Sequence, residues 1–497
     1  MTTPPRPALA VAAALVATLA LTTSHAPAST AVDGVESPLA ASWQQTPVPG
    51  AAELPAGITV THWTEKDPGK DNRSRPRLLQ VVEIDPTAAP LDLQSTVGTG
   101  DGLAETVAEQ LAAVSPKSPS RHPLAGVNGS LFKSEKPHPD LASAGPVTLQ
   151  HMGVSVTDGV LHGSSCWGGG QGTSGAVIQY GVPYITKLRT DLTLTASDGS
   201  APMRLDDINR DPGRARGCAR DNEDRLIPQE QAGDQKGVFV DADEIVLFTS
   251  DYKYPVPKPG LDPYVTTDDD EGYEVVLDAT GKVTAARASR GGGKGNTAQV
   301  TVPSGGRILQ GVGTGATWLR DHAPLNSTLA VSQKLTDTRF KREIPLDPSL
   351  DVVSSFHQLL RNGDVPAELP DTCGDTDTGV DGTEICTDSR VALGTNVRGR
   401  TVLVTLTGQP QASTATTHED GAWLRDFAEL LHSGELGLID ALNLDGGGSA
   451  TLITATTTPG TTTVRTPPTD RVNGTYVHRA VSDAVYAGIS GYGMYKK

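Results

Sequence analysis

The stretch Asn443-Leu444-Asp445-Gly446-Gly447-Gly448-Ser449, close to the C-terminal end, constrains the fold and the function most strongly. An apolar run over residues 436–442 leads into it, and residues 449–453 resume a strand-like pattern. Glycine is used where φ must be positive or where another group approaches the backbone closely. Three consecutive glycines beside a carboxamide and a carboxylate therefore predict a wall of N–H groups that suits a polar or anionic ligand. A strand-connecting turn of Asn, Asp and Gly is the alternative.

Polar and charged residues interrupt strand-like sequence at other places too. Asn128-Gly129 ends an apolar run, and a hairpin turn is the alternative interpretation of that pair. Arg390 and Arg479 each lie at a strand-like stretch, where a largely buried guanidinium needs a carboxylate or phosphate partner. A structural ion pair is the alternative for Arg390. Asp483 follows on the same late segment as Arg479.

The pattern of apolar residues predicts the fold class. Short strand-like runs recur along most of the chain, at residues 58–63, 78–84, 91–93, 125–132, 154–156, 176–178, 192–194, 244–248, 273–277 and 298–302. Helical spacing is found at residues 106–114 and, most clearly, at residues 420–431. We therefore predict an α+β fold, a strand-rich mixed-sheet domain with a few packed helices.

The N-terminal residues are typical of an export signal. Residues 8–21 form a short apolar run after Arg6, and Ala26-Pro27-Ala28 has the small-x-small form of a cleavage site. An anchoring helix is the alternative. We predict a signal peptide at 1–28, a flexible lead-in at 29–50 and a single domain at 51–497. The expected protein is secreted and extracellular, with no integral membrane segment after signal cleavage.

Four cysteines fit an oxidising compartment, where disulfides persist. Three pairings are open. Cys166–Cys218 and Cys373–Cys386 are favoured because short loops close most easily. The spacing is not that of a zinc site.

The composition narrows the range of partners and cofactors. A formal net charge of −17, spread along the chain, argues against nucleic acid as a partner. Serine-hydrolase, Walker and His-Glu-x-x-His motifs are absent from the sequence. The acidic run at residues 268–271 lacks the ligand spacing of an EF-hand, and we interpret it as a solvated loop. No cofactor is certain, the metal is unknown, and a structural or catalytic divalent cation such as calcium stays an open alternative.

Taken in order, these elements resemble the phosphodiester glycosidase family. The family pattern runs Asn-Gly-x-x-Phe, an Arg-x-Ala-x-Gly strand, a helix, then Ala-x-Asn-Leu-Asp-Gly-Gly-Gly-Ser and a closing Arg-x-Val strand. The matching stretches here are residues 128–132, 390–394, 421–431, 441–449 and 479–481. The resemblance places the core motifs at 125–485 and implies a phosphodiester glycosidase-like fold. Segments near 164–225 and 363–388 look like insertions that reshape the cleft.

The resemblance implies a secreted hydrolase, a glycosidase that acts on a sugar-1-phosphodiester or on a related cell-wall or exopolysaccharide linkage. Its partner is then a carbohydrate or sugar-phosphate substrate. We assign the catalytic carboxylates to Asp445 and Asp483, by resemblance and position. The predicted substrate-binding residues are Asn128, Gly129, Arg390, Asn443, Gly446, Gly447, Gly448, Ser449 and Arg479.

The sequence also departs from the family pattern. Leu131 stands where an aromatic residue is common before Phe132, and Thr407-Gly408-Gln409 stands where Asp-Gly-Arg is expected, which removes one anion contact. Two alternatives therefore stay open: a non-catalytic secreted carbohydrate-binding relative, and a glycosidase acting on phosphate-free wall glycans.

Overall fold

The computed structural model of the chain describes thirteen stretches, which are residues 41–67, 75–118, 120–134, 149–227, 237–256, 272–288, 300–369, 388–409, 421–433, 436–456, 458, 460–472 and 475–491. The chain divides into two units, Met1–Glu36 and Ser37–Lys497, and all of the described residues lie in the second.

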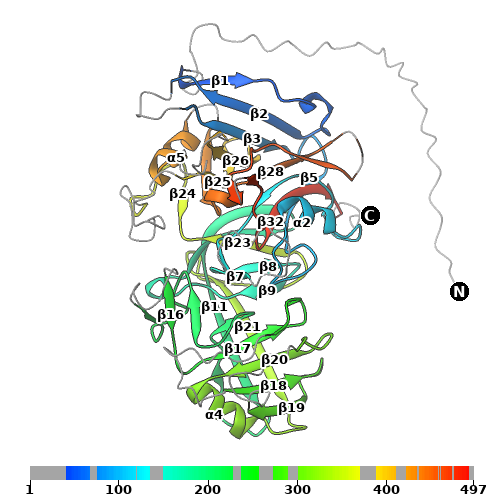
Figure 1. Ribbon diagram of the computed structural model, residues 1–497, viewed down its shortest axis with the longest axis vertical. Coiled ribbons are helices and arrows are strands. Elements are labelled where there is room, and N and C mark those ends of the chain that lie inside the picture. The colour runs from blue at the N-terminus through cyan, green and yellow to red at the C-terminus, as the bar shows by residue number, and fades with distance from the viewer. Residues whose placement is uncertain are drawn as a thin grey trace, which may run out of the picture. The chain divides into compact units, whose positions relative to one another are not determined.

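A seven-stranded antiparallel sheet, in the upper part of Figure 1, contains the strand that leads into the glycine-rich stretch. We call it the first sheet. Its order is β1 (Trp43–Thr46), β2 (Ile58–Glu65), β3 (Leu78–Ile84), β26 (Thr401–Thr407), β25 (Arg390–Asn396), β27 (Leu438–Asn443) and β24 (Gln358–Leu360). The segment 29–50, expected to be a flexible lead-in, therefore contains strand β1. Trp43 of this strand is buried in the core of the sheet, which holds the strand in place.

A five-stranded antiparallel sheet, the second sheet, packs face to face on the first. Its order is β29 (Thr462–Val464), β28 (Leu452–Ala455), β5 (Ser120–Asn128), β32 (Ala484–Ser490) and β4 (Leu91–Thr96). Val82 and Leu393 of the first sheet share one core with Val127 and Val485 of the second. Alternate residues of a strand point to opposite faces, so each sheet has a second apolar face to cover.

Helices cover these outer faces. Helix α5 (Leu424–His432) packs Phe427 and Leu431 onto the first sheet, and α2 (Val107–Ala113) packs on the second. Thr106 begins α2 with a capping box, because its hydroxyl accepts from the Glu109 N–H at 3.3 Å while the Glu109 carboxylate accepts from the Thr106 N–H at 2.8 Å. The result is a helix–sheet–sheet–helix stack.

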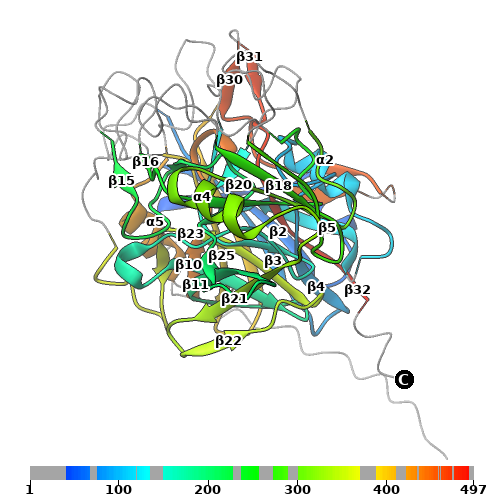
Figure 2. The same cartoon turned by 90° about the horizontal axis from the view of Figure 1, so that it is seen from below.

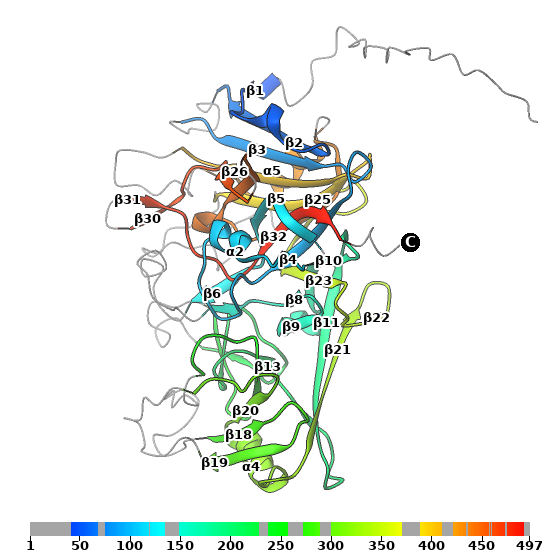
Figure 3. The ribbon, with the colours of Figure 1, turned by 90° about the vertical axis from the view of Figure 1, so that its right-hand side faces the viewer.

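Two more sheets share a separate core, which joins Val177 and Leu194 to Leu247 and Leu309. The third sheet runs β22 (Arg342–Ile344), β21 (Leu329–Asp337), β11 (Val182–Ala196), β10 (Thr173–Gln179), β23 (Leu350–Ser355), β8 (Ser155–Thr157) and β9 (Val160–Gly163), with β12 (Met203–Arg204) on β11. The fourth runs β13 (Asp207–Ile208), β17 (Ile245–Thr249), β20 (Arg307–Gly311), β18 (Tyr273–Leu277) and β19 (Val283–Ala288). Figure 3 shows β11 and β21 running side by side, and α4 (Gly313–His322) beside β18 and β20.

The remaining described elements are a small sheet, two pairs of short strands and several 3₁₀ turns. A three-stranded sheet contains β14 (Arg214–Arg216), β16 (Val238–Val240) and β15 (Arg225–Leu226), and two hairpins pair β6 (Phe132–Ser134) with β7 (Leu149–His151) and β30 (Asp470–Val472) with β31 (Thr475–Val477). The β30–β31 hairpin stands at the top of Figure 2. Three short 3₁₀ turns are η1 (Ala51–Glu53), η4 (Gly168–Gly170) and η7 (Gly447–Ser449).

The strand-rich character with few helices agrees with the prediction, but the α+β label and the expected mixed sheet fit only loosely. Among the described strands, β13–β17 is the single parallel pair. The strand expected at residues 298–302 is wrong for its described part, because Val300 makes only an isolated bridge to Val256. Helix α4 was not predicted, because its sequence begins Gly-Thr-Gly-Ala-Thr and has weak helical propensity.

The buried carboxylate of Asp351 links the third sheet to the second. Its carboxylate accepts from the Ser95 hydroxyl at 3.0 Å and from the Asp158 N–H at 3.2 Å. Burial, followed by repulsion from Asp158, raises the pKa of Asp351 to about 8. The unfolded carboxyl ionises near pH 4, so wild-type stability should fall by up to about 1.4 kcal/mol per pH unit between pH 4 and pH 8 from this group.

Asp351→Asn is expected to remove this pH dependence. The free energy of unfolding of the variant should therefore rise relative to that of the wild type as pH increases from 4 to 8. Urea unfolding at several pH values measures the difference. Asp278→Asn, at an exposed turn, is the matched control and should leave the slope in place. Equal slopes in wild type and Asp351→Asn would contradict the prediction.

Candidate active site

The glycine-rich stretch lies along the beginning of β25. The Leu444 N–H donates to the Val391 carbonyl at 2.8 Å, and the Gly447 N–H donates to the Ser389 carbonyl at 2.8 Å. A side chain at Gly446 would collide with that same Ser389 carbonyl, and Gly447 has a φ of +57°. Two of the three glycines are therefore required by the backbone itself.

The third glycine makes room for an arginine. Any Cβ on Gly448 would collide with the guanidinium of Arg479, which therefore lies directly on the glycine backbone. Arg479 Nε donates to Asp470 at 2.7 Å. The Thr469 hydroxyl holds the same turn through the Gly447 and Gly448 carbonyls, at 3.2 and 3.0 Å. One of the two predicted strand arginines is thus brought to the predicted glycine wall.

Asp445 stands between these positive groups and another carboxylate. The residue as a whole is partly exposed, but its carboxyl group is buried. This burial raises the pKa of the carboxyl to about 6. Ser449, Arg479 and Lys133 oppose that rise, whereas the negative charge of Asp388 adds to it. A carboxyl that titrates near neutral pH can exchange a proton with a substrate or a water under ordinary conditions.

Asp388 and Lys133 are members of the site that sequence reasoning missed. Asp388 accepts from the Ser389 N–H at 2.8 Å, and its other carboxylate oxygen lies about 3.1 Å from the position of a Cβ on Gly447. The signal for Asp388 was its place two residues before Arg390. Lys133 follows the Asn-Gly-x-x-Phe motif directly and had no signal beyond that position.

Arg390 begins β25 and is tied to the segment before α5. Its Nε donates to the Ala422 carbonyl at 2.7 Å. It also lies close enough to His357 to contribute, after burial and Lys187, to lowering the pKa of that imidazole to about 4. The two predicted arginines therefore approach the glycine-rich stretch from different elements.

Asn443, the last residue of β27, presents a polar atom without a partner. The residue is 7% exposed, its N–H donates to the His357 carbonyl at 3.1 Å, and its Oδ1 has no hydrogen-bond partner among the described residues. A buried acceptor left unpaired is costly unless a ligand or water satisfies it. This oxygen is therefore suited to accept a hydrogen bond from a substrate hydroxyl.

Asn128 and Gly129 brace Asp445 from the second sheet. Asn128 is fully buried; its Nδ2 donates to the Asp445 carbonyl at 2.6 Å, and its Oδ1 accepts from the Thr451 N–H at 3.0 Å. The Gly129 carbonyl accepts from the Asp445 N–H at 3.0 Å. These contacts position the carboxylate through its backbone, so the geometry favours a positioning role for this pair over the predicted contact with substrate.

Asp483, which we predict as a second catalytic carboxylate, lies directly behind Gly129. The residue is 1% exposed, and its oxygens accept from the Ser130 N–H at 2.6 Å, the Ser130 hydroxyl at 2.8 Å and the Ser155 hydroxyl at 3.0 Å. His151 Nδ1 lies 3.8 Å away. With its oxygens occupied by protein donors, Asp483 is better suited to hold the 128–130 turn, and Asp388 is the carboxylate beside Asp445.

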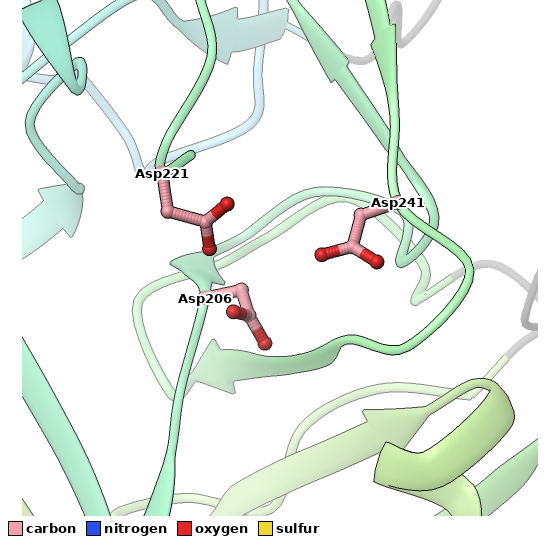
Figure 4. A group of neighbouring side chains, drawn as sticks. All are labelled: Asp206, Asp221 and Asp241. Atoms are coloured by element: carbon pink, nitrogen blue, oxygen red, sulfur yellow. The ribbon is translucent and has the colours of Figure 1, made fainter. Parts of the chain in front are cut away.

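Three buried carboxylates outside this site fit a divalent cation by chemistry. Asp206, Asp221 and Asp241 offer oxygens that all lie within 4.8 Å of one another (Figure 4). Carboxylate oxygen is the ligand type that calcium prefers. Burial raises the pKa of Asp241 to about 6, and Arg204 pairs with Asp221. The acidic run at 268–271 lies outside the described residues.

Cys166 and Cys218 form a disulfide across 52 residues. The cross-link should stabilise the fold by about 4 kcal/mol in the chain-entropy model. The double variant Cys166→Ser/Cys218→Ser is therefore expected to unfold at lower urea concentration, with a slope at least as steep as that of the wild type because its unfolded chain is free to expand. Free thiols at these two positions in a non-reduced peptide map would contradict the pairing. Cys373 and Cys386 lie outside the described residues, and their pairing stays a prediction.

Comparison with known proteins shows which family this part of the chain is similar to. Residues 272–487 match the family model for phosphodiester glycosidase, which confirms the resemblance predicted from the sequence. The matched segment contains Asp388, Arg390, the glycine-rich stretch and Arg479; the brace at 128–129 lies before it. Among curated proteins, no sequence matches this chain significantly.

Solved structures show a similar fold. A protein of Burkholderia pseudomallei, named for its expected export, gives a TM-score of 0.63 at 26% identity over 83% of this chain and 74% of that one. A hypothetical protein from Synechocystis gives 0.52 at 16% identity over 88% and 64%, which supports the fold alone. The zebrafish N-acetylglucosamine-1-phosphodiester alpha-N-acetylglucosaminidase catalytic domain, auto-inhibited by its pro-peptide, gives 0.35 at 14% identity over 90% of each chain.

The described helices are also too short or too polar to cross a bilayer; none of them is a candidate membrane span.

Proposed function

We propose that this protein is a glycosidase that hydrolyses the bond between a sugar and the phosphate of a sugar-1-phosphodiester. The observation that carries the proposal is the environment of Asp445: a carboxyl with a pKa of about 6, placed beside Arg479 and Lys133 on a glycine backbone. The match of residues 272–487 to the phosphodiester glycosidase family supports it. The cations suit a phosphate, and the carboxyl suits the anomeric carbon.

The charge of each side chain suggests which part of the substrate it would contact. Phosphate is a good leaving group, so its departure needs stabilisation of negative charge more than it needs a proton. Arg479, Lys133 and Arg390 are the cations that would hold its oxygens. The Asn443 Oδ1 would accept from a sugar hydroxyl.

Asp445 would take the proton from the attacking water, or attack the anomeric carbon itself, once it is ionised. In the first case the C1–O bond to phosphate breaks, the phosphate oxygen keeps the electron pair, and the water oxygen bonds to C1. Asp388, whose negative charge acts on Asp445, is the second carboxylate in reach of the reaction. Its charge and that of Asp445 would together favour the positive charge that develops on the sugar ring.

We also propose that the protein works outside the cell. The Cys166–Cys218 disulfide supports this, because disulfides persist in oxidising compartments. The relative from Burkholderia pseudomallei is itself named for export.

The test is hydrolysis of a synthetic sugar-1-phosphodiester in water enriched in ¹⁸O. The proposal expects free sugar carrying the label and an unlabelled phosphomonoester, with no inorganic phosphate, because the C–O bond is the one that breaks. Label in the phosphate would mean P–O cleavage and a phosphodiesterase instead. Turnover of a phosphate-free wall glycan, with none of the phosphodiester, would favour the alternative glycosidase.

A further inference from the structure

A cavity of about 520 Å³ lies within the predicted insertion at 164–225, ahead of the segment that matches the family model. Its walls come from four short stretches, which are residues 164–167, 189–193, 202–206 and 220. Its lining includes none of the candidate active-site residues described above. A volume of this size falls within the range of small-molecule sites, so the cavity can hold a ligand of one or two sugar rings.

Trp167 forms part of the wall and is held in place by its own loop. The Trp167 residue is 37% exposed, and its backbone N–H donates to the Ala219 carbonyl at 2.8 Å. The preceding residue, Cys166, is held by the disulfide to Cys218. The turn that follows is built of glycines with positive φ, and the Cβ position of Gly170 lies 3.5 Å from the indole ring. Gly170 thus lies beside the aromatic ring, and a tryptophan side chain has few rotatable bonds to restrict when a ligand stacks on it.

The charged side chains of the cavity are paired with one another or with close neighbours. Arg189 lies 3.2 Å from Asp191, and Arg204 pairs with Asp221. Arg220 Nε lies 2.6 Å from Asp207. Each arginine of the lining therefore already has a carboxylate, so an anionic ligand would gain little attraction. Together the pairs present both donors and acceptors, which is the requirement of a neutral ligand with many hydroxyls.

We propose that this cavity is a second carbohydrate-binding site that takes a pyranose unit of a neutral glycan, stacked on Trp167. Aromatic side chains combine an apolar face with polar surroundings, and the sugar ring offers a C–H face and hydroxyl edges that match this arrangement. This role rests on the proposed function: the cavity would hold a second sugar unit of a polymeric substrate, away from the bond that is hydrolysed.

The experiment is titration of the full-length protein with chitotetraose, cellotetraose and mannotetraose, followed by tryptophan fluorescence and by calorimetry. At least one of the three should bind saturably to the wild type. Trp167→Ala should weaken that binding by about tenfold or more, since stacking and apolar contact with the ring are both removed. Trp423→Ala is the matched control, because Trp423 is 36% exposed and lies outside the cavity.

Two further variants separate this site from the active site. Arg189→Ala should weaken binding with the tryptophan intact, and Arg479→Lys should leave it unchanged. Trp167→Ala should hydrolyse a small sugar-1-phosphodiester at the wild-type rate. If the wild type hydrolyses no phosphodiester yet binds a tetrasaccharide through Trp167, the proposed function fails and this site stands. No saturable binding of any of the three glycans, or wild-type binding by Trp167→Ala, would overturn the inference.

Discussion

Asp445→Asn is expected to slow the hydrolysis of a sugar-1-phosphodiester by at least ~100-fold, because it removes the base or nucleophile. The fold should survive the change. Burial disfavours the charged form of Asp445, so its folded pKa of about 6 lies above the value near 4 of the unfolded chain. Wild-type stability from this group is therefore lost as pH rises from 4 to 6, and the variant should be at least as stable as the wild type at pH 8.

The wild-type pH profile gives a second readout of the same prediction. Because Asp445 acts when ionised, the rate should rise with pH through about 6 and then level. The control is Asp440→Asn, on the same strand β27. The Asp440 carboxylate accepts from the Asn362 N–H at 3.2 Å and from Gln358 Nε2 at 3.5 Å. It should keep most of the activity. Retention of more than about a tenth of the turnover by Asp445→Asn would show that Asp445 is a turn residue.

Arg479→Lys is expected to lower kcat/KM by about 10- to 100-fold, the loss associated with one strong hydrogen bond to a charged group. Lysine keeps the charge but not the fork, and Nε of Arg479 is already engaged by Asp470 at 2.7 Å, which leaves the outer nitrogens for the phosphate. Comparison of phosphodiester substrates with and without a second charged group on the aglycone would measure the lost contact.

Arg479→Gln provides a test that a purely structural arginine would not satisfy. Arg479 lowers the pKa of Asp445, so removing its charge should raise that pKa and move the rising limb of the pH profile to higher pH. Arg479→Lys should leave the limb near its wild-type position. A loss of melting temperature in parallel with activity, with no movement of the limb, would assign Arg479 to the ion pair with Asp470 alone.

Much of the local structure could be predicted from the sequence, because it depends on neighbours in the chain. The strands predicted at 78–84 and 58–63 follow from alternating or continuous apolar runs. They appear as β3 and as β2, which extends to Glu65. The helix before the glycine-rich stretch follows from the spacing of Phe427 and Leu431, and it appears as α5. The motif around Asp445 stood out for the same reason: three glycines in a row signal a backbone that something must approach.

The membership and the roles of the site depended on tertiary structure. Asp388 and Lys133 lie 57 and 312 positions before Asp445 in the sequence and reach it only through the pairing of strands and the packing of two sheets. We predict Asn128 as a substrate-binding residue and Asp483 as a catalytic one. Only the structure shows that both are buried, that Asn128 donates to the Asp445 carbonyl and that Asp483 accepts from the Ser130 N–H.

The sequence by itself thus determined the elements and the motif that carries the carboxylate, since backbone conformation and amphipathic spacing are properties of adjacent residues. Only the tertiary structure decided which charges surround Asp445, how far burial raises its pKa, and where a second cavity forms beside Trp167. The physical reason is that electrostatic environment and burial arise from segments far apart in the chain, and no local pattern encodes the distance between them.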